Sequence, residues 1–438
     1  MTRSDWTKGW ETVTDITATD AMLVDLKNER YSLSANGNGV TWGANNGLKL
    51  IDFIQTDENG NYAGVVDIND PNWDKLVEQV SFDDALNFIE NNGEGLQSIQ
   101  SIGYPANGNN DGPIGFIYGQ VPGYFVKWSN GSDSEPTYVA ETDDKANWSM
   151  SVMPTEPVVA ATFNKKLVER EGEMLGEQSL WANLPSIMAP GLNVHRNAYN
   201  GRNHEYYSED SMLSNRMGVA VTTGASHKGL MTEVKHFAFN QQEYDRTGIS
   251  TFFNEQAARE NELRSFQGAL EGNTAMSIMT PFNRAGTIWA GAHEGLLTNI
   301  VRNEWGFTGW ITTDMINGAD YQNWKDAISA GSSETLSNRK TWAESRWNTM
   351  NANRDLILSD TVFQQKMQQG LKYTFYTTVR SNAVNGITSN TEMVYVQTWW
   401  QKAIRWTTYG LGVVTVLLAA LYVHGEVKKS KKNGKRGA

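Results

Sequence analysis

The 438-residue sequence contains no cysteine, so it can form neither a disulfide framework nor a thiolate metal or redox site. It also lacks an excess of positive charge outside its last residues. Residues 425–438 carry a net +5, which leaves about −17 on the rest of a chain whose total charge is −12. A body this acidic offers no basic surface for nucleic acid, which is therefore excluded as a partner.

The N-terminus lacks the apolar region of a secretory signal peptide. A long uncharged run lies near the other end, at residues 406–424. Its length approaches the roughly 20 apolar residues that cross a bilayer as a helix. A buried helix of a soluble protein is the alternative, but the lysines that follow favour a transmembrane helix over residues 403–424. By the positive-inside rule, we expect a single-pass protein of the cell membrane, with the basic tail 425–438 in the cytoplasm and the body outside the cell.

The sequence before this helix divides by composition. Residues 1–65 are polar and rich in glycine and asparagine, which indicates a linker or the remnant of an upstream domain. Strand-like and helix-like patterns then alternate over residues 66–385, and residues 386–402 form a juxtamembrane segment. The alternation predicts an α/β fold, and the long polar loops favour a (β/α)8 TIM-like barrel over an open sheet. The predicted strands cover residues 158–163, 186–189, 234–239 and 275–279, and a further strand ends at Asp314.

Helical periodicity predicts the helices between these strands. Ser81 has the position of an N-cap residue, with an acid three residues later. The apolar faces that define the helices are Phe82, Leu86 and Ile89; Leu167, Met174 and Leu175; Leu213, Met217, Ala220 and Val221; Leu263, Phe266 and Leu270; and Leu296, Leu297, Ile300 and Val301.

The most informative segment is residues 305–314, where a helix end, a glycine turn and a short apolar strand lead to one carboxylate. In parallel α/β architectures the ligand crevice lies at the carboxyl ends of the strands, so Asp314 stands where a catalytic group is expected. The alternative is an aspartate that only opens the next turn. The composition of the other loops favours the catalytic interpretation.

Those loops carry the polar side chains that a sugar pocket requires. Asp111 lies in a tight turn, Arg202 lies among carboxylates and aromatic residues, and Lys235 and His236 close a strand. Carboxylates that accept from hydroxyls, together with cationic donors, match the polar groups of a sugar ring, each of which costs free energy when it is buried unpaired. Taken singly, each residue also fits a structural role, such as that of a core histidine.

Together and in this order, these segments resemble glycoside hydrolase family 3, which contains the β-glucosidases. The resemblance covers about residues 70–380 and rests on seven motifs: 111–113, 189–196, 201–203 with 208–210, 235–237, 257–260, 279–283 and 304–314. It implies a barrel and a retaining mechanism with Asp314 as the nucleophile. It also implies that the sugar is held by Asp111, Arg202, Lys235, His236, Met279 and Phe282, and it implies no metal or cofactor.

The sequence departs from the family where a general acid is needed. Retaining hydrolysis requires a second carboxyl, which the β-glucosidases of the family take from a separate sandwich domain. No segment resembling that domain follows the barrel, and the loop at residues 238–241 lacks the histidine that single-domain members use. Glu205, Glu209 and Glu243 resemble loop-bracing residues, so the acid/base stays unassigned. Met315 replaces the tryptophan common after the nucleophile, and Ser211 replaces a frequent proline.

Two classes of function therefore remain open. The first is a membrane-anchored, retaining β-glycosidase of the β-glucosidase type, which cleaves terminal non-reducing β-linked sugars through a glycosyl-enzyme on Asp314. Its acid/base would come from a sandwich-domain partner or a missing upstream domain. The second is a membrane-anchored sugar-binding protein that no longer turns over. A phosphorylase with the same nucleophile is a third and weaker alternative.

Overall fold

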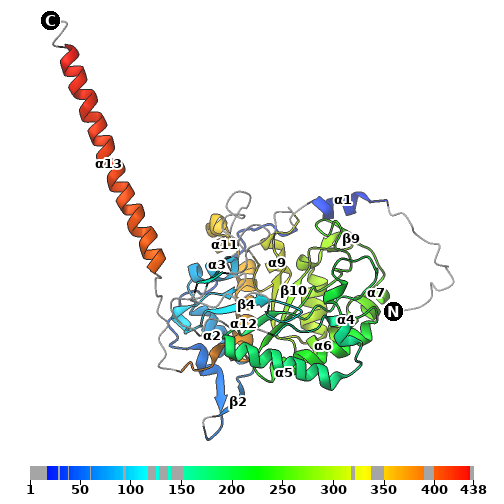
Figure 1. The fold of residues 1–438 in the computed structure, drawn as a ribbon. Helices are drawn as coiled ribbons and strands as arrows, with labels where there is room; N and C mark the ends of the chain where they lie inside the picture. Colours follow the sequence, from blue (N-terminus) through cyan, green and yellow to red (C-terminus); the bar gives the residue numbers. More distant parts are fainter. Residues whose placement is uncertain are drawn as a thin grey trace. The chain divides into compact units, whose positions relative to one another are not determined.

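The computed structural model describes residues 17–27, 30–37, 39–59, 61–91, 95–116, 125–127, 137–139, 151–316, 321–336, 350–388 and 399–434. The chain divides into two units, Met1–Met393 and Val394–Ala438, and each is described by itself. The first unit is a central sheet surrounded by helices, and the second contains one long helix, α13 (Trp399–Gly434) (Figure 1).

The first unit is built on a six-stranded sheet with the strand order β13-β10-β8-β7-β4-β3. The strands are β3 (Gly95–Leu96), β4 (Asn107–Asp111), β7 (Ser186–Met188), β8 (Met231–Val234), β10 (Ser277–Thr280) and β13 (Trp310–Thr313). All neighbours pair in parallel except β3, which is antiparallel to β4. The predicted parallel α/β sheet is thus confirmed, and its strands end at one common edge.

The described strands form half of a barrel, so closure into eight strands stays a prediction. Beyond β13, Ser333 N donates to Ile311 O at 2.7 Å, and Leu336 N donates to Thr313 Oγ1 at 3.1 Å. The segment that ends at Leu336 therefore follows the outer edge of β13. It brings an apolar side chain to the end of the sheet where Asp314 lies.

Two of the predicted strands differ from the structure. Residues 158–163, expected as a buried strand, begin inside the short helix α4 (Glu156–Ala160), where Val158 is exposed and Val159 is buried. Pro157 in the first turn and the acid before it favour a helix start, and they override the β-branched run. The strand expected at 234–239 instead begins at Met231 and ends at Val234, and it includes the ionisable but buried Glu233.

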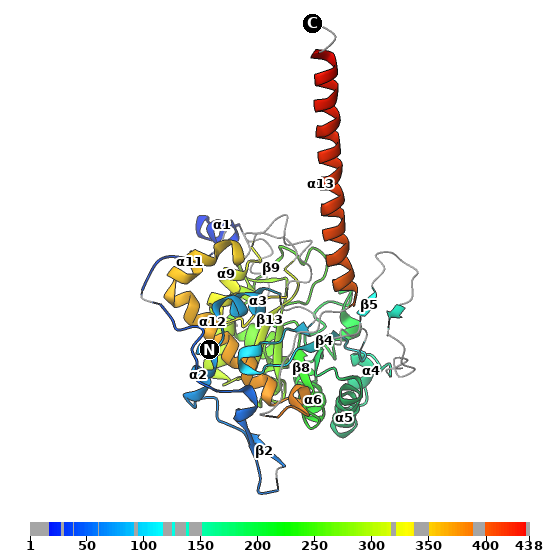
Figure 2. The same cartoon turned by 90° about the vertical axis from the view of Figure 1, so that its left-hand side faces the viewer.

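Helices α5 (Lys165–Ala182), α6 (Ser211–Ser226) and α8 (Arg264–Glu271) cover one side of the sheet (Figures 1 and 2). The predicted faces of α6 and α8 are confirmed, since Met217, Val221, Phe266 and Leu270 are buried. The predicted face of α5 is wrong for two of its three residues. Leu167 and Met174 are exposed, because glycines on another face of α5 contact α6.

Helices α2 (Asn72–Glu78), α3 (Phe82–Asn91), α9 (Trp324–Ala330), α11 (Arg354–Ser359) and α12 (Thr361–Val379) surround a second apolar cluster. Ser81 caps α3 as predicted, since Asp84 N donates to its Oγ at 3.0 Å. Part of the predicted linker packs here: Leu50 and Phe53 are buried in this cluster. Asp360, the N-cap of α12, accepts from Tyr31 and Asn36. Residues 31–37 and 39–53 are therefore part of the folded first unit.

Smaller elements decorate this body. They are α1 (Asp20–Lys27), the hairpin β1–β2 (Ile54–Thr56 and Tyr62–Val65), the pair β5–β6 (Phe125–Lys127 and Thr137–Val139), β9 (Ser250–Thr251), β11 (Arg284–Ala285), β12 (Ile288–Trp289) and α7 (Glu255–Ala257). Two π-helices, Ala258–Glu262 and Gly295–Glu304, complete the described layer of helices. The second of these π-helices buries Leu296, Leu297 and Val301 and leads to β13, as the periodicity predicts.

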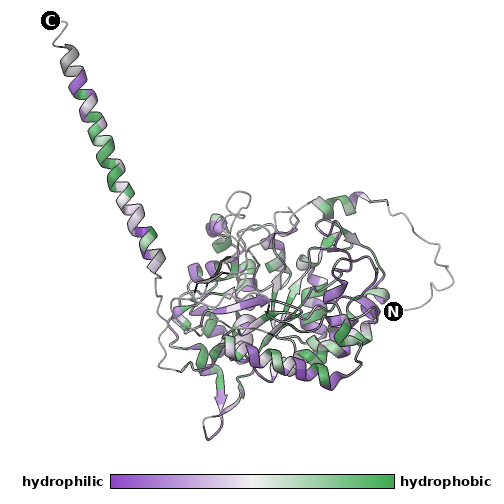
Figure 3. Cartoon of the chain, viewed as in Figure 1, coloured by the Kyte–Doolittle hydropathy of each residue, from purple (hydrophilic) through white to green (hydrophobic). Residues whose placement is uncertain are grey.

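The second unit contains the predicted membrane helix. Within α13, residues Lys402–Lys429 are long and apolar enough to cross a membrane, and no part of this stretch is buried by other described residues. Figure 3 shows its hydrophobic middle as a green band between more polar ends. Length and composition alone are weak support, so the membrane span stays a prediction.

Candidate active site

A cavity of about 370 Å³ lies at the carboxyl ends of the parallel strands. Asp111 is the last residue of β4, while Lys235 and Asp314 directly follow β8 and β13. The lining residues are Asp111, Met188, Arg202, Lys235, His236, Glu243, Arg246, Met279, Asp314, Met315 and Leu336. The structure thus brings together six of the seven residues that the sequence suggests. The seventh, Phe282, is buried beneath the guanidinium of Arg246 and does not line the cavity.

Asp314 is held with one carboxylate oxygen tied to the backbone. The N–H of Met315 donates to Oδ1 at 2.7 Å, and Oδ2 lies 3.7 Å from His236 Nε2. Burial raises the pKa of Asp314, while the positive charges of Arg202 and Arg246 oppose the rise. These cations favour the ionised carboxylate that a nucleophile must be.

Lys235 and Asp111 form an ion pair at the base of the cavity. Lys235 Nζ donates to Asp111 Oδ1 at 2.5 Å, with side-chain exposures of 3% and 32%. Burial by itself would lower the pKa of Lys235, but the carboxylates of Asp111 and Glu205 outweigh it, and the pKa is raised. The ammonium stays charged and can donate to a hydroxyl that enters the cavity.

His236 is fixed by both its backbone and its ring. Its N–H donates to Asn193 Oδ1 at 2.8 Å, and Asn193 returns a hydrogen bond to its carbonyl. The ring Nδ1 lies 3.3 Å from the hydroxyl of Tyr206. Burial lowers the pKa of His236 well below its usual value, and the nearby Arg202 and Lys235 lower it further. The ring is therefore neutral and can donate or accept one hydrogen bond towards the cavity.

Two arginines and two glutamates brace the wall of the cavity. Arg202 Nε donates to Glu205, and Arg202 lies 3.7 Å from Glu243, which also pairs with Arg246 at 2.8 Å. Asn240 donates to Glu243 at 2.9 Å as well. These pairs agree with the bracing role that the sequence suggests for Glu205 and Glu243.

The opposite wall is apolar. Met188, Met279 and Leu336 form one buried cluster, and Met315 stands 41% exposed at the cavity. Neither Met188 nor Leu336 was predicted from the sequence. The strand-end rule that selects Asp314 could have selected Met188, the last residue of β7. Leu336 carries no comparable signal, because it reaches the cavity only through the pairing of its segment with β13.

Two further carboxyls near the cavity are buried and raised in pKa but do not line it. Burial raises the pKa of Glu233 to about 8 and that of Glu156 well above its usual value. Glu233 accepts from Asn109 at 3.2 Å on the strand next but one. Among the described residues that line the cavity, each carboxylate other than Asp314 lies in an ion pair with a lysine or an arginine. The general acid, which the sequence left unassigned, therefore stays unassigned.

A larger cleft of about 680 Å³ lies beside α2 and α12, near the residues that precede β13. Its lining includes the ion pair between Lys372 and Asp74 and several glutamines. No histidine is among the described residues that line it. The strand-end cavity, although smaller, combines a nucleophile, cationic donors and an apolar wall. It is therefore the candidate active site.

Comparison with known proteins agrees with this site. Residues 145–369, just over half of the chain, match the glycosyl hydrolase family 3 N-terminal domain. The chain therefore belongs to glycosyl hydrolase family 3. A β-glucosidase from Ruminococcus albus is 36% identical over 162 residues, which are 37% of this chain and 17% of that protein. An exo-α-(1→6)-L-arabinopyranosidase from Bifidobacterium longum is 30% identical over 226 residues, which are 52% of this chain and 28% of that protein.

Solved structures show the same fold. A β-glucosidase from Paenibacillus barengoltzii superposes with a TM-score of 0.61 at 26% identity, covering 82% of this chain and 37% of that one. β-Glucosidase 3B from Thermotoga neapolitana, in complex with glucose, gives a TM-score of 0.61 at 23% identity and covers 71% and 43%. This chain thus spans less than half the length of each of these relatives.

Proposed function

We propose that this chain carries the nucleophile and the sugar pocket of a retaining β-glycosidase of the β-glucosidase type. The observation that carries the proposal is the position of Asp314, which faces the strand-end cavity opposite Lys235, His236 and Asp111. Membership of glycosyl hydrolase family 3 and likeness to β-glucosidases support a glycoside hydrolase. The closed eight-stranded barrel belongs to the same proposal.

In the first step, a carboxylate oxygen of Asp314 attacks the anomeric carbon of a terminal β-linked sugar. The bond from that carbon to the glycosidic oxygen breaks, and the leaving group departs with the electron pair and gains a proton. Asp111, Lys235, His236 and Arg202 hold the sugar hydroxyls during this step. In the second step water attacks the same carbon, loses a proton and releases Asp314 as a carboxylate.

The proton for the leaving group comes from outside this chain in our proposal, from a sandwich-domain partner or an upstream domain. The contacts of Glu205 and Glu243 support this, because Arg202 and Arg246 engage both carboxylates in ion pairs. The loss of general acid help costs roughly 10²- to 10⁴-fold in rate when the leaving group is poor. The isolated chain should therefore cleave nitrophenyl glucosides slowly and cellobiose hardly at all, and a supplied family sandwich domain should restore cellobiose cleavage.

A 2-fluoro-β-glucoside with an activated leaving group tests the nucleophile, because it accumulates the glycosyl-enzyme. The label should add its mass to the peptide that contains Asp314, and the Asp314→Ala variant should not be labelled. Glu209→Gln is a matched control in a neighbouring loop and should be labelled like the wild type. A label on Glu205 or Glu209 would remove Asp314 from the role.

The alternative of a sugar-binding protein without turnover rests on the same ion-paired carboxylates. The two functions differ in one measurement. A binding protein takes up gluconolactone or glucose but releases no nitrophenol from an activated glucoside and gains no label from the 2-fluoro sugar. A glycosidase that lacks only its acid does both.

We also propose that residues 403–424, within the apolar stretch Lys402–Lys429, anchor the chain in the cell membrane, with the basic tail 425–438 in the cytoplasm and the site outside. The apolar stretch and the lysines beyond it support this orientation. Protease added to intact cells should release the first unit and leave the tail protected. Full protection of the first unit would reverse the orientation or remove the span.

A further inference from the structure

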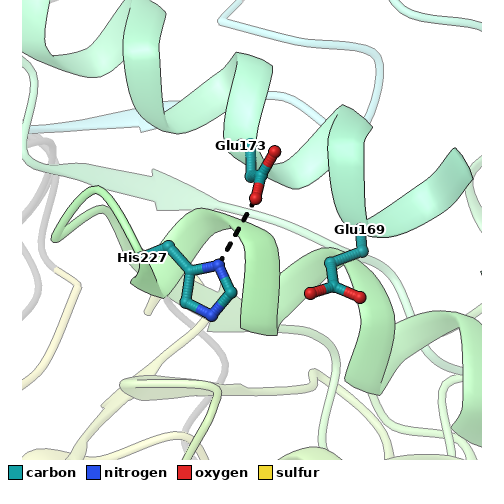
Figure 4. Close-up of side chains that lie close together, drawn as sticks. All are labelled: Glu169, Glu173 and His227. Carbon is teal, nitrogen blue, oxygen red and sulfur yellow. Dashed lines mark hydrogen bonds and ion pairs between the residues drawn. The ribbon is translucent and has the colours of Figure 1, made fainter. Parts of the chain in front are cut away.

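Three side chains with metal-binding atoms gather on the outer face of the helical layer, outside the candidate active site (Figure 4). Glu169 and Glu173 lie one turn apart on α5, and His227 follows the last residue of α6. One ligand atom from each lies within 4.8 Å of the other two. The closest pair, His227 Nδ1 and a Glu173 oxygen, is 3.5 Å apart.

Glycines fix the separation of the two helices at this point. A Cβ on Gly224 would lie 1.9 Å from the carbonyl oxygen of Glu169, and a Cβ on Gly172 would lie 2.1 Å from that of Val221. The backbones of α5 and α6 are therefore in direct contact beside the three side chains. This contact holds the Cα atoms of the cluster on two rigid elements, as a preorganised metal site requires.

We propose that Glu169, Glu173 and His227 bind one divalent transition-metal ion, with Zn²⁺ the best match, which clamps α5 to α6. One imidazole and two carboxylates are a ligand set that Zn²⁺ takes, with water as the fourth ligand. Bonds of about 2.1 Å in a tetrahedron put ligand atoms roughly 3.4 Å apart. The His227–Glu173 pair already has about this spacing, and the partly buried Glu169 reaches it by a side-chain rotation.

Without a bound cation, the three side chains contribute little electrostatic stabilisation. Two glutamates at positions i and i+4 of a helix repel each other. The carboxylate of Glu169 makes no hydrogen bond or ion pair with another described residue, while Lys228, the residue after His227, pairs with Glu177 instead. The ordinary alternative is an exposed His227–Glu173 ion pair, which would use only one of the two carboxylates.

The test uses the full chain without an affinity tag, titrated with ZnCl₂ in a calorimeter and followed by thermal unfolding. We expect one Zn²⁺ per chain with micromolar affinity and a rise in Tm of a few degrees, because the ion binds only the folded state. Glu169→Gln, Glu173→Gln and His227→Asn should each weaken binding at least tenfold. Glu177→Gln, one turn further along α5, is the matched control and should leave affinity unchanged.

Two results would overturn the proposal. One is the absence of Zn²⁺ binding at millimolar concentration. The other is wild-type affinity in the three cluster variants, which would put the ion elsewhere on the chain. Unfolding of each variant without zinc shows that a loss of affinity is not a loss of folding. Removal of zinc by a chelator should leave cleavage of nitrophenyl glucosides unchanged, so this test is independent of the proposed glycosidase.

Discussion

Asp111 provides the sharpest test of the sugar pocket, because its hydrogen bond with Lys235 joins two groups that line the cavity. It accepts from the buried ammonium of Lys235 at 2.5 Å and keeps about a third of its own side chain exposed to the cavity. A sugar hydroxyl that donates to the exposed oxygen would gain a charge-assisted hydrogen bond. Asp111→Ala removes that acceptor and leaves Lys235 without its nearest counter-charge.

The expected loss of affinity follows from these contacts. A hydrogen bond to a charged group contributes roughly 1.5–3 kcal/mol, so the loss of about 2 kcal/mol should weaken binding of glucose or gluconolactone about 30-fold. The charged Lys235 is also left buried, which should lower the stability of the free chain. Because Asp111 is about a third exposed, solvent screening should hold this second cost to roughly 1–2 kcal/mol.

The assay is calorimetric titration of gluconolactone, with thermal unfolding of the free chain measured beside it. Asp111→Asn is the matched control, since it keeps the size and the turn-forming ability of the side chain but loses the charge. We expect its affinity to fall between those of the wild type and Asp111→Ala. An unchanged affinity in a folded Asp111→Ala variant would mean that Asp111 only shapes its turn.

Three other predictions follow from single side chains. Because burial raises the folded-state pKa of Glu233 to about 8 from an ordinary 4.5, the folded state binds the extra proton between these values, and stability should fall as pH rises through that window. Glu233→Gln should reduce this slope in Tm measured from pH 5 to 8.5, and an equal slope in both proteins would contradict the burial argument. Met315→Trp should lower KM for aryl glucosides roughly 2- to 10-fold by stacking at the mouth of the cavity, checked against an alkyl glucoside that should not change. Gly224→Ala should cost about 1–3 kcal/mol in chemical unfolding, because its Cβ would meet α5, whereas Gly201→Ala, which meets nothing within 4 Å, should cost far less.

Strands β7, β10 and β13 of the parallel sheet were predictable because they lie in short apolar runs bounded by helices, whereas β4 (Asn107–Asp111) is polar and gave no such signal. The strand-end rule then placed Asp314 and Lys235 at one edge, and the structure puts both in one cavity. The predictions that were wrong concern the type or the bounds of single elements. Val158 belongs to a β-branched run that is typical of a strand, but Glu156 and Pro157 in the first turn favour a helix. The start of β8 at Met231 was not predicted, because an ionisable residue such as Glu233 is normally exposed and not part of a buried strand.

The packing of α5 could not be predicted from hydrophobic periodicity. Its contact face is made by Gly172 and Gly176, which bury no side chain and so leave no apolar signal. The periodicity instead selected Leu167 and Met174, which the structure exposes. A contact face made of glycines can be recognised only when the partner helix also has a glycine at the crossing, as α6 has in Gly224. Leu336 was not predicted to line the cavity for a similar reason. Its hydrogen bond to β13, and not a local sequence pattern, places it there.

The carboxyls around the cavity divide by environment into two kinds, and this division decides what chemistry the described residues support. A general acid must hold its proton near neutral pH, which burial without a partner achieves, as it does for Glu156 and Glu233. Neither of these lines the cavity. Glu243 does line it, but its carboxylate is engaged in ion pairs with Arg202 and Arg246. The carboxyls able to donate a proton thus lie apart from the space where a leaving group would stand. A substrate whose leaving group departs unprotonated is therefore the one that the described site can process unaided, while efficient cleavage of cellobiose by this chain alone would reveal an acid in another part of it.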